Sequence, residues 1–153
     1  MLPSGDCAFA PPYAFLNDLL EFDPSMKFKV IRSPIKCVKK SSKKLVIFGI
    51  KSMPINRKRR DVIRKTWLNP KYWTQIGFDI HVLFLIGDPH FNGLLAKEFE
   101  ETGDILQLDF QEGHYMLPFK DQAYFEYIET NCPEADYVFK ADDDILMIPG
   151  TVP

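Results

Sequence analysis

The sequence has no apolar run long enough to cross a membrane as a helix. A spanning helix needs about 20 consecutive apolar residues, whereas the longest runs here, Leu45–Ile50 and Val82–Ile86, have the length of strands. Residues 1–10 contain neither the basic segment nor the apolar segment that begins a secretory leader. We therefore expect no membrane anchor and no signal peptide within these 153 residues.

Cysteine is scarce, and neither sign of charge dominates. The three cysteines include no C-x-x-C pair, so a zinc site is not expected. Cys37 and Cys132 would pair in an oxidising compartment and leave Cys7 over, and the alternative is three free or buried thiols. The formal net charge of −2 gives no general affinity for nucleic acid, so no nucleic-acid partner is expected.

Apolar and aromatic residues are plentiful, and they fall in alternating segments. The hydrophobic content of 46% is enough for a core, and 153 residues correspond to one domain or part of one. Apolar runs predict strands at 45–50, 80–86, 105–110 and 137–140, and helical periodicity lies between them at 57–68, from 91 to the glycine at 103, and at 119–130. This alternation predicts an α/β fold, a mainly parallel sheet with helices on both faces. The proline-interrupted residues 1–44 are expected to be a stem-like lead-in to a domain at 45–153.

Three consecutive aspartates, Asp142, Asp143 and Asp144, follow the last predicted strand. Adjacent carboxylates repel one another unless water or a cation offsets their charge. Ligands of parallel sheets bind at the carboxyl ends of the strands, and hard oxygen ligands there suit Mn²⁺ or Mg²⁺ held against a phosphate. A solvated acidic turn is the alternative.

Four blocks, taken in chain order, resemble the beta-1,3-glycosyltransferases of the Golgi, which include galactosyltransferases and N-acetylglucosaminyltransferases. The first block is similar to the family pattern I-x-S … R-R-x-x-I-R-x-T-W, and the last block contains the three aspartates. The blocks lie at 50–52 with 59–67, 84–87, 100–120, and 132 with 140–144. The loop at 112–120 departs from the family pattern D-S-Y-x-N-L-T-x-K.

This resemblance implies the N-terminal, nucleotide-sugar-binding part of a GT-A-like domain. The implied function is a hexosyltransferase for protein glycosylation, which moves a hexose or N-acetylhexosamine from a UDP-sugar to a glycan acceptor in a beta-1,3 linkage with inversion. The alternative is a catalytically inactive nucleotide-sugar-binding fragment. The family also implies a Mn²⁺ or Mg²⁺ cofactor and a Golgi lumenal location. A single-pass type II membrane anchor is expected in a full-length form, and the catalytic base is expected beyond residue 153.

The resemblance and the residue chemistry together select the candidate site residues. We expect Asp144 to bind the metal directly and Asp142 to contact the metal, through its water, or the ribose, with Asp143 also on the nucleotide side. Ser52 is a candidate for the base or ribose, or else a turn hydroxyl.

Two arginines and a lysine are further candidates. Guanidinium groups suit diphosphate oxygens, so Arg60 and Arg64 are candidates for the nucleotide, with structural ion pairs as the alternative. Lys120 would either reach the cleft or be a solvated lysine in the first turn of its helix. Trp67 is expected to be a core residue rather than a platform for a sugar.

Overall fold

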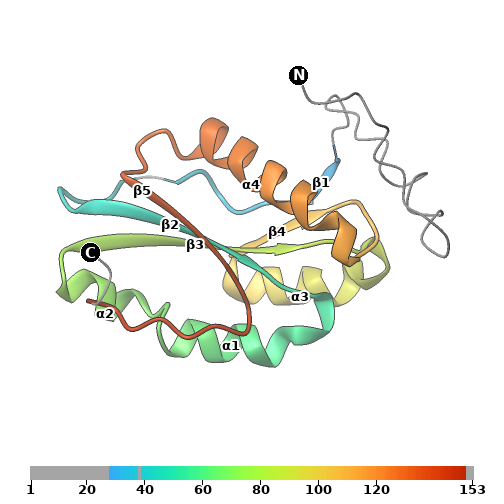
Figure 1. Ribbon diagram of the computed structural model, residues 1–153, viewed down its shortest axis with the longest axis horizontal. Coiled ribbons are helices and arrows are strands. Elements are labelled where there is room, and N and C mark those ends of the chain that lie inside the picture. Colours follow the sequence, from blue (N-terminus) through green and yellow to red (C-terminus); the bar gives the residue numbers. More distant parts are fainter. Residues whose placement is uncertain (1–27, 38, 151–153) are drawn as a thin grey trace, which may run out of the picture.

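Five strands form one sheet in the part of the chain that the computed structural model describes, residues 28–37 and 39–150 (Figure 1). The sheet order is β1-β4-β3-β2-β5, and only β1 runs antiparallel to its neighbour. The strands are β1 (Val30–Arg32), β2 (Lys44–Lys51), β3 (Phe78–Ile86), β4 (Ile105–Leu108) and β5 (Tyr137–Asp142). The predicted mainly parallel sheet is confirmed.

Helices cover both faces of this sheet, which confirms the predicted α/β class. In Figure 1, α4 lies on one face, and α1, α2 and α3 lie on the other. The helices are α1 (Arg57–Lys65), α2 (Pro70–Gln75), α3 (Asn92–Thr102) and α4 (Leu117–Asn131). None of the described helices is both long and apolar enough to cross a membrane.

Alternation along the central strands divides their side chains between two cores. Ile47 and Leu83 face α4 and pack in one cluster with Tyr124. Phe48 faces the other helices, in a cluster that includes Ile63, Trp67 and Leu95. Strands buried on both faces are continuously apolar, which explains the short apolar runs of the sequence. Trp67 is 3% exposed, so it is a core residue, as expected.

The segment after α1 differs from the sequence prediction. The predicted helix at 57–68 ends at Lys65, and a second helix, α2, begins at Pro70. The Asn69 side chain caps α2 by accepting a hydrogen bond from the Lys71 N–H. Proline is favoured in the first turn of a helix, so Asn69-Pro70 begins a helix here. β5 also extends to Asp142, two residues past its predicted end.

Part of the predicted lead-in contributes to the sheet. β1 pairs with β4, and Arg32 extends the contact by donating hydrogen bonds to Gln107 Oε1 at 2.7 Å and Asn92 Oδ1 at 2.6 Å. Of the predicted lead-in, residues 1–27 and 38 lie outside the described residues. The domain start at residue 45 therefore stays a prediction.

A disulfide joins Cys37 to Cys132, with their Cα atoms 4.9 Å apart. The bond ties the chain before β2 to the residue that follows α4. The pairing considered from the sequence is thus confirmed, and the alternative of free thiols is wrong for these two residues. Cys7 lies outside the described residues.

Candidate functional site

The carboxyl ends of β2 and β5 lie side by side in the sheet. Lys51 and Asp142, the last residues of the two strands, are partners in the parallel register. Ser52 follows β2, is 3% exposed, and donates its N–H to Leu85 O at 3.1 Å. The sheet therefore places the aspartate triplet next to a segment that is distant in sequence, since Ser52 and Asp143 are 91 residues apart.

A pocket of about 410 Å³ opens beside these strand ends. It contains Ser52 and all three aspartates but neither Arg60 nor Arg64. Its lining residues are Lys51, Ser52, Met53, Asn56, Arg59, Glu112, Gly113, His114, Leu117, Lys120, Asp142, Asp143 and Asp144.

The middle aspartate is held by the protein. The Asp143 carboxylate accepts hydrogen bonds from Ser52 Oγ at 2.7 Å and Asn56 Nδ2 at 2.9 Å, and it pairs with Arg59 at 3.2 Å. Its side chain is 9% exposed. Three donors satisfy most of the acceptor capacity of a carboxylate, so Asp143 ties β5 to the turn that follows β2.

The two outer aspartates keep their oxygen atoms available. The Asp142 side chain is 61% exposed and lies 3.5 Å from Lys51 Nζ. Asp144 is exposed and has no hydrogen-bond or ion-pair partner among residues 28–37 and 39–150. Two carboxylates, separated by an anchored residue, supply the hard oxygen ligands that Mg²⁺ and Mn²⁺ prefer. The donor set of the pocket therefore fits such an ion.

Lys120 forms the floor of the pocket rather than lying in solvent. It is 2% exposed, and its Nζ donates to Ser52 O at 2.9 Å and pairs with Glu112 at 2.7 Å. Glu112 also accepts the Gly87 N–H at 2.6 Å, so it joins the ends of three elements. Burial lowers the pKa of Lys120, and the attraction of Glu112 offsets only part of this effect.

Arg60 and Arg64 lie behind the pocket in a buried ionic network. Arg60 is 0% exposed, and its five N–H groups all point to protein acceptors, including both oxygens of Glu98 at 2.8 and 2.6 Å and Ser52 Oγ at 3.0 Å. Arg64 pairs with Glu98 at 2.8 Å and with both oxygens of Asp104 at 2.7 Å. Burial disfavours its charge, but the hydrogen bonds that Arg64 donates to Asp104 and Glu98 outweigh this and raise the pKa of Arg64. These contacts correspond to the ion-pair alternative considered for both arginines.

Several pocket residues were not selected from the sequence as site residues, among them Lys51, Asn56 and Arg59. Lys51 ends β2, Asn56 lies in the turn before α1, and Arg59 is in the first turn of α1. The sequence signal of these three residues is their position, because they lie between the end of a predicted strand and the first turn of the helix predicted after it. Arg59 belongs to a run of four basic residues at 57–60, and the sequence does not show which of them are exposed. The fold exposes the Arg59 side chain and buries that of Arg60.

The chain matches the family model described as galactosyltransferase over residues 58–152. It is also similar to the lactosylceramide 1,3-N-acetyl-beta-D-glucosaminyltransferase of Rattus norvegicus, with 34% identity over 148 residues, or 88% of this chain and 38% of that protein. The N-acetyllactosaminide beta-1,3-N-acetylglucosaminyltransferase 3 of Homo sapiens is 36% identical over 108 residues, or 66% of this chain and 28% of that protein.

A third relative is also a beta-1,3-N-acetylglucosaminyltransferase. The UDP-GlcNAc:betaGal beta-1,3-N-acetylglucosaminyltransferase 7 of Rattus norvegicus is 34% identical over 110 residues, or 65% of this chain and 27% of that protein. The chain thus spans less than two fifths of the length of these curated relatives. The family match begins at the second residue of α1 and includes the pocket loop before α4 and the aspartate triplet.

Proposed function

Because this chain belongs to the galactosyltransferase family, a group of beta-1,3-glycosyltransferases, we propose that its pocket binds the nucleotide part of a UDP-sugar together with Mn²⁺ or Mg²⁺. In the reaction that we propose, a hexose or N-acetylhexosamine is transferred from this UDP-sugar to a glycan acceptor, in a beta-1,3 linkage with inversion. Residues 45–153 form the nucleotide-sugar-binding part, and residues 1–44 lead into it.

One observation carries this proposal: the triplet is divided into an anchored middle aspartate and two available outer ones. Asp143 fixes the turn through Ser52, Asn56 and Arg59. The anchor holds Asp142 and Asp144 at the mouth of the pocket, where they would ligate the metal. Held by these two residues, a divalent ion would supply positive charge against a diphosphate leaving group.

The charge of the pocket supports a requirement for metal. Its lining contains three cations, Lys51, Arg59 and Lys120, and four carboxylates, which leaves an excess of one negative charge. A divalent ion reverses this excess, so an anionic diphosphate is attracted only to the metal-bound pocket. We assign Lys51 and Arg59, rather than the fully engaged Arg60, as the cations nearest to the phosphates.

The disulfide supports the expected compartment. Disulfides form and persist in oxidising compartments, including the secretory pathway. The Cys37–Cys132 bond therefore agrees with a lumenal Golgi location for the domain. We propose this location, with a membrane anchor in a full-length form.

Calorimetric titration of UDP in the presence of Mn²⁺ tests the site. We expect Asp144→Ala and Asp142→Ala to weaken UDP binding by tenfold or more, because each removes a proposed metal ligand. Asp79→Ala, at the amino end of β3 where Asp79 bonds Ser41, is the matched control and should bind like the wild type. Equal UDP affinity for the wild type and Asp144→Ala, with both proteins folded, would disprove the metal site.

Turnover is a separate question, because the pocket offers no free carboxylate besides the two proposed metal ligands. Glu112 is paired with Lys120, and Asp143 is held by three donors. This arrangement favours the second candidate, nucleotide-sugar binding without turnover by this chain. A panel of UDP-hexoses with Mn²⁺ decides between them, since ordinary enzymes turn over at roughly 1 per second or faster.

A further inference from the structure

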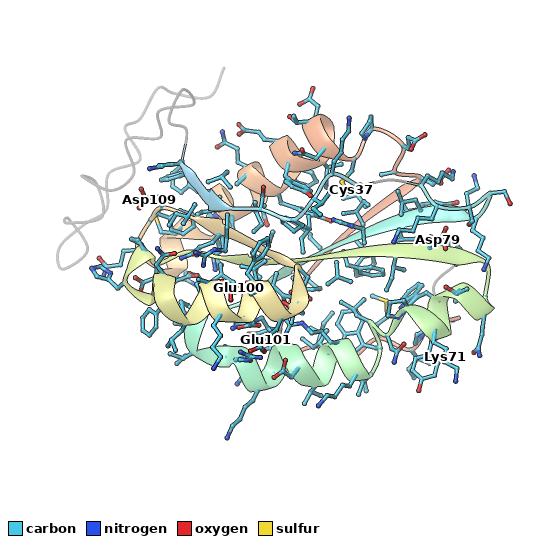
Figure 2. The ribbon with its side chains drawn as sticks, turned by 180° about the vertical axis from the view of Figure 1, so that it is seen from behind. Cys37, Lys71, Asp79, Glu100, Glu101 and Asp109 are labelled. Atoms are coloured by element: carbon cyan, nitrogen blue, oxygen red, sulfur yellow. A yellow bond between two sulfur atoms is a disulfide. The ribbon has the colours of Figure 1, made fainter. Side chains whose placement is uncertain are left out.

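His81 lies beside the Cys37–Cys132 disulfide, at the end of the sheet opposite to the pocket. A ring nitrogen of His81 and the two Sγ atoms all lie within 4.8 Å of one another. His81 is in β3, opposite Ile47 in the register, and alternation places its side chain on the same face as Leu83 and Leu85. Figure 2 shows Cys37 on this face, between the sheet and α4.

The imidazole of His81 has a ring nitrogen that is available to bind a metal. Its Nε2 is buried and has no hydrogen-bond partner among the described residues. Burial lowers the pKa of His81, and the positive charge of Lys40 lowers it further, while Asp104 opposes the shift. The ring is therefore neutral near pH 7, and a neutral imidazole offers one nitrogen lone pair to a metal.

A solvent-facing cavity reaches this cluster. Its volume is about 620 Å³, and Cys37 and His81 both contribute to its wall, with Lys40 and Asp79 among the other lining residues. The cysteines themselves are 4% and 2% exposed. A small reductant or a metal ion thus has a path to groups that are otherwise buried.

We propose that reduction of the Cys37–Cys132 disulfide creates a Cys₂His site for a thiophilic divalent cation such as Zn²⁺. A thiol reductant supplies two electrons and two protons: the S–S bond breaks, two cysteine thiols form, and two reductant molecules join in a disulfide. Metal binding then releases both thiol protons. The three ligand atoms already lie within 4.8 Å of one another, so Zn–S bonds of about 2.3 Å and Zn–N bonds of about 2.0–2.1 Å need only small movements from the present cluster.

This site is independent of the proposed nucleotide pocket. Cys132 lies before the amino end of β5, whereas the aspartates begin at its carboxyl end. The ligand chemistry also differs, because thiolates and imidazole select Zn²⁺ and Co²⁺, whereas carboxylates suit Mn²⁺ and Mg²⁺. The two sites can therefore be tested separately in one protein.

Co²⁺ titration of the full chain tests the proposal, because cobalt bound to thiolate absorbs in the near ultraviolet and cobalt bound to carboxylate does not. The chain, with Cys7→Ser to leave two thiols, is reduced with a phosphine and desalted under argon. We expect one equivalent of Co²⁺ to produce the sulfur-to-cobalt band, one equivalent of Zn²⁺ to remove it, and the oxidised protein to show none. His81→Ala should weaken the Co²⁺ binding that the sulfur-to-cobalt band reports by tenfold or more, whereas Glu129→Gln, at an exposed position of α4, should leave it unchanged.

Circular dichroism of each sample establishes that the fold is present. Absence of the band in reduced, folded protein would overturn the proposal, and so would equal Co²⁺ affinity of His81→Ala and its parent. The proposal is also overturned if reduction removes the native spectrum and Zn²⁺ does not restore it, because the proposed site requires a folded chain. Cys37→Ser serves as the matched control, since it should abolish the band whether or not reductant is added.

Discussion

At the scale of single residues, neighbours in sequence differ sharply in environment. Arg59 has 58% of its side chain exposed, whereas Arg60, the next residue, is fully buried against Glu98. The three aspartates divide in the same way, with Asp143 anchored and the other two exposed. Residue type alone does not assign these roles, because each depends on which partner the fold brings close.

Glu98 is the residue on which the buried network depends. It is 2% exposed and accepts hydrogen bonds from both Arg60 and Arg64, which hold its pKa below the usual range although burial alone would raise it. Glu98→Ala leaves buried guanidinium charge without its partner, so we expect the free energy of unfolding to fall by about 3–5 kcal/mol. Urea denaturation measures this loss.

Glu101, which lies three residues after Glu98 in α3, provides the control for Glu98→Ala. Figure 2 shows Glu101 between α3 and α1, where it pairs with Arg57. Its side chain is 46% exposed, and exposed ion pairs contribute about 0–1 kcal/mol. Comparable losses for Glu101→Ala and Glu98→Ala would contradict the importance assigned to burial of the network.

At the scale of elements, close contact between α4 and β2 depends on one glycine. A Cβ atom on Gly49 would lie 2.5 Å from the ring of Tyr124. The Tyr124 hydroxyl lies 2.9 Å from Ile47 O and 2.8 Å from Phe139 O, so this side chain joins α4 to both β2 and β5. Glycine at position 49 therefore lets the helix sit directly on the sheet.

Two glycine substitutions should have opposite effects on stability. Gly49→Ala forces the Tyr124 ring away from the sheet, so we expect the free energy of unfolding to fall by about 1–3 kcal/mol. Gly93→Ala, in α3 with open space around it, should raise this free energy by about 0.5–1 kcal/mol because alanine is favoured in helices. Thermal or urea unfolding compares them, and a stabilising Gly49→Ala would show that the contact is not tight.

The amino ends of β2 and β5 are joined by a carboxylate. Asp136 accepts the Leu45 N–H at 2.8 Å and pairs with Lys39 at 2.9 Å. The backbone hydrogen bond, followed by the one from Lys39, lowers the pKa of Asp136 from 3.8 to about 2. Because the folded pKa is the lower one, this stabilisation is complete above pH 3.8 and is lost as the pH falls toward 2.

Asp136→Asn should therefore be less stable than the wild type at pH 7, and the difference should shrink as the pH falls from 4 to 2. Urea unfolding at several pH values measures this change. Thr130→Ala, at an exposed position of α4, changes no titrating group and should show no such pH-dependent difference. A constant gap between wild type and Asp136→Asn across the acid range would refute the role of the Asp136 charge.

At the scale of the whole molecule, the disulfide closes most of the described chain into one loop. Cys37 and Cys132 are 95 residues apart in sequence, and a bond that closes a long loop stabilises chiefly by restricting the unfolded chain. This loop includes β2, β3, β4 and all four helices. One covalent bond therefore affects the stability of nearly every element.

Reduction should lower the free energy of unfolding by about 2–4 kcal/mol, because the reduced unfolded chain regains its conformational freedom. Denaturation with and without a phosphine reductant measures this difference. The double variant Cys37→Ser with Cys132→Ser should resemble the reduced wild type and should not respond to reductant. No effect of reduction on the wild type would mean that the unfolded chain is already restricted.

The sequence by itself determined the α/β class, the mainly parallel sheet and the position of the aspartate triplet at the end of a strand. These features are local, because the length of an apolar run and its alternation with helical periodicity are properties of neighbouring residues. Sequence reasoning missed α2, because Asn69-Pro70 can either end one helix or begin the next. It also missed the edge strand β1, because three residues are too few to show the alternation of a strand.

Only the tertiary structure decided which side chains form the pocket. It buried Lys120 beneath Ser52, used all five donors of Arg60 within the protein, and anchored Asp143 while leaving Asp142 and Asp144 at the pocket mouth. The physical reason is that the cost of burying a charge is offset only by partners distant in sequence, such as Glu98 for Arg60. Those partners are brought together by the order and register of the strands, which no local pattern of residues encodes.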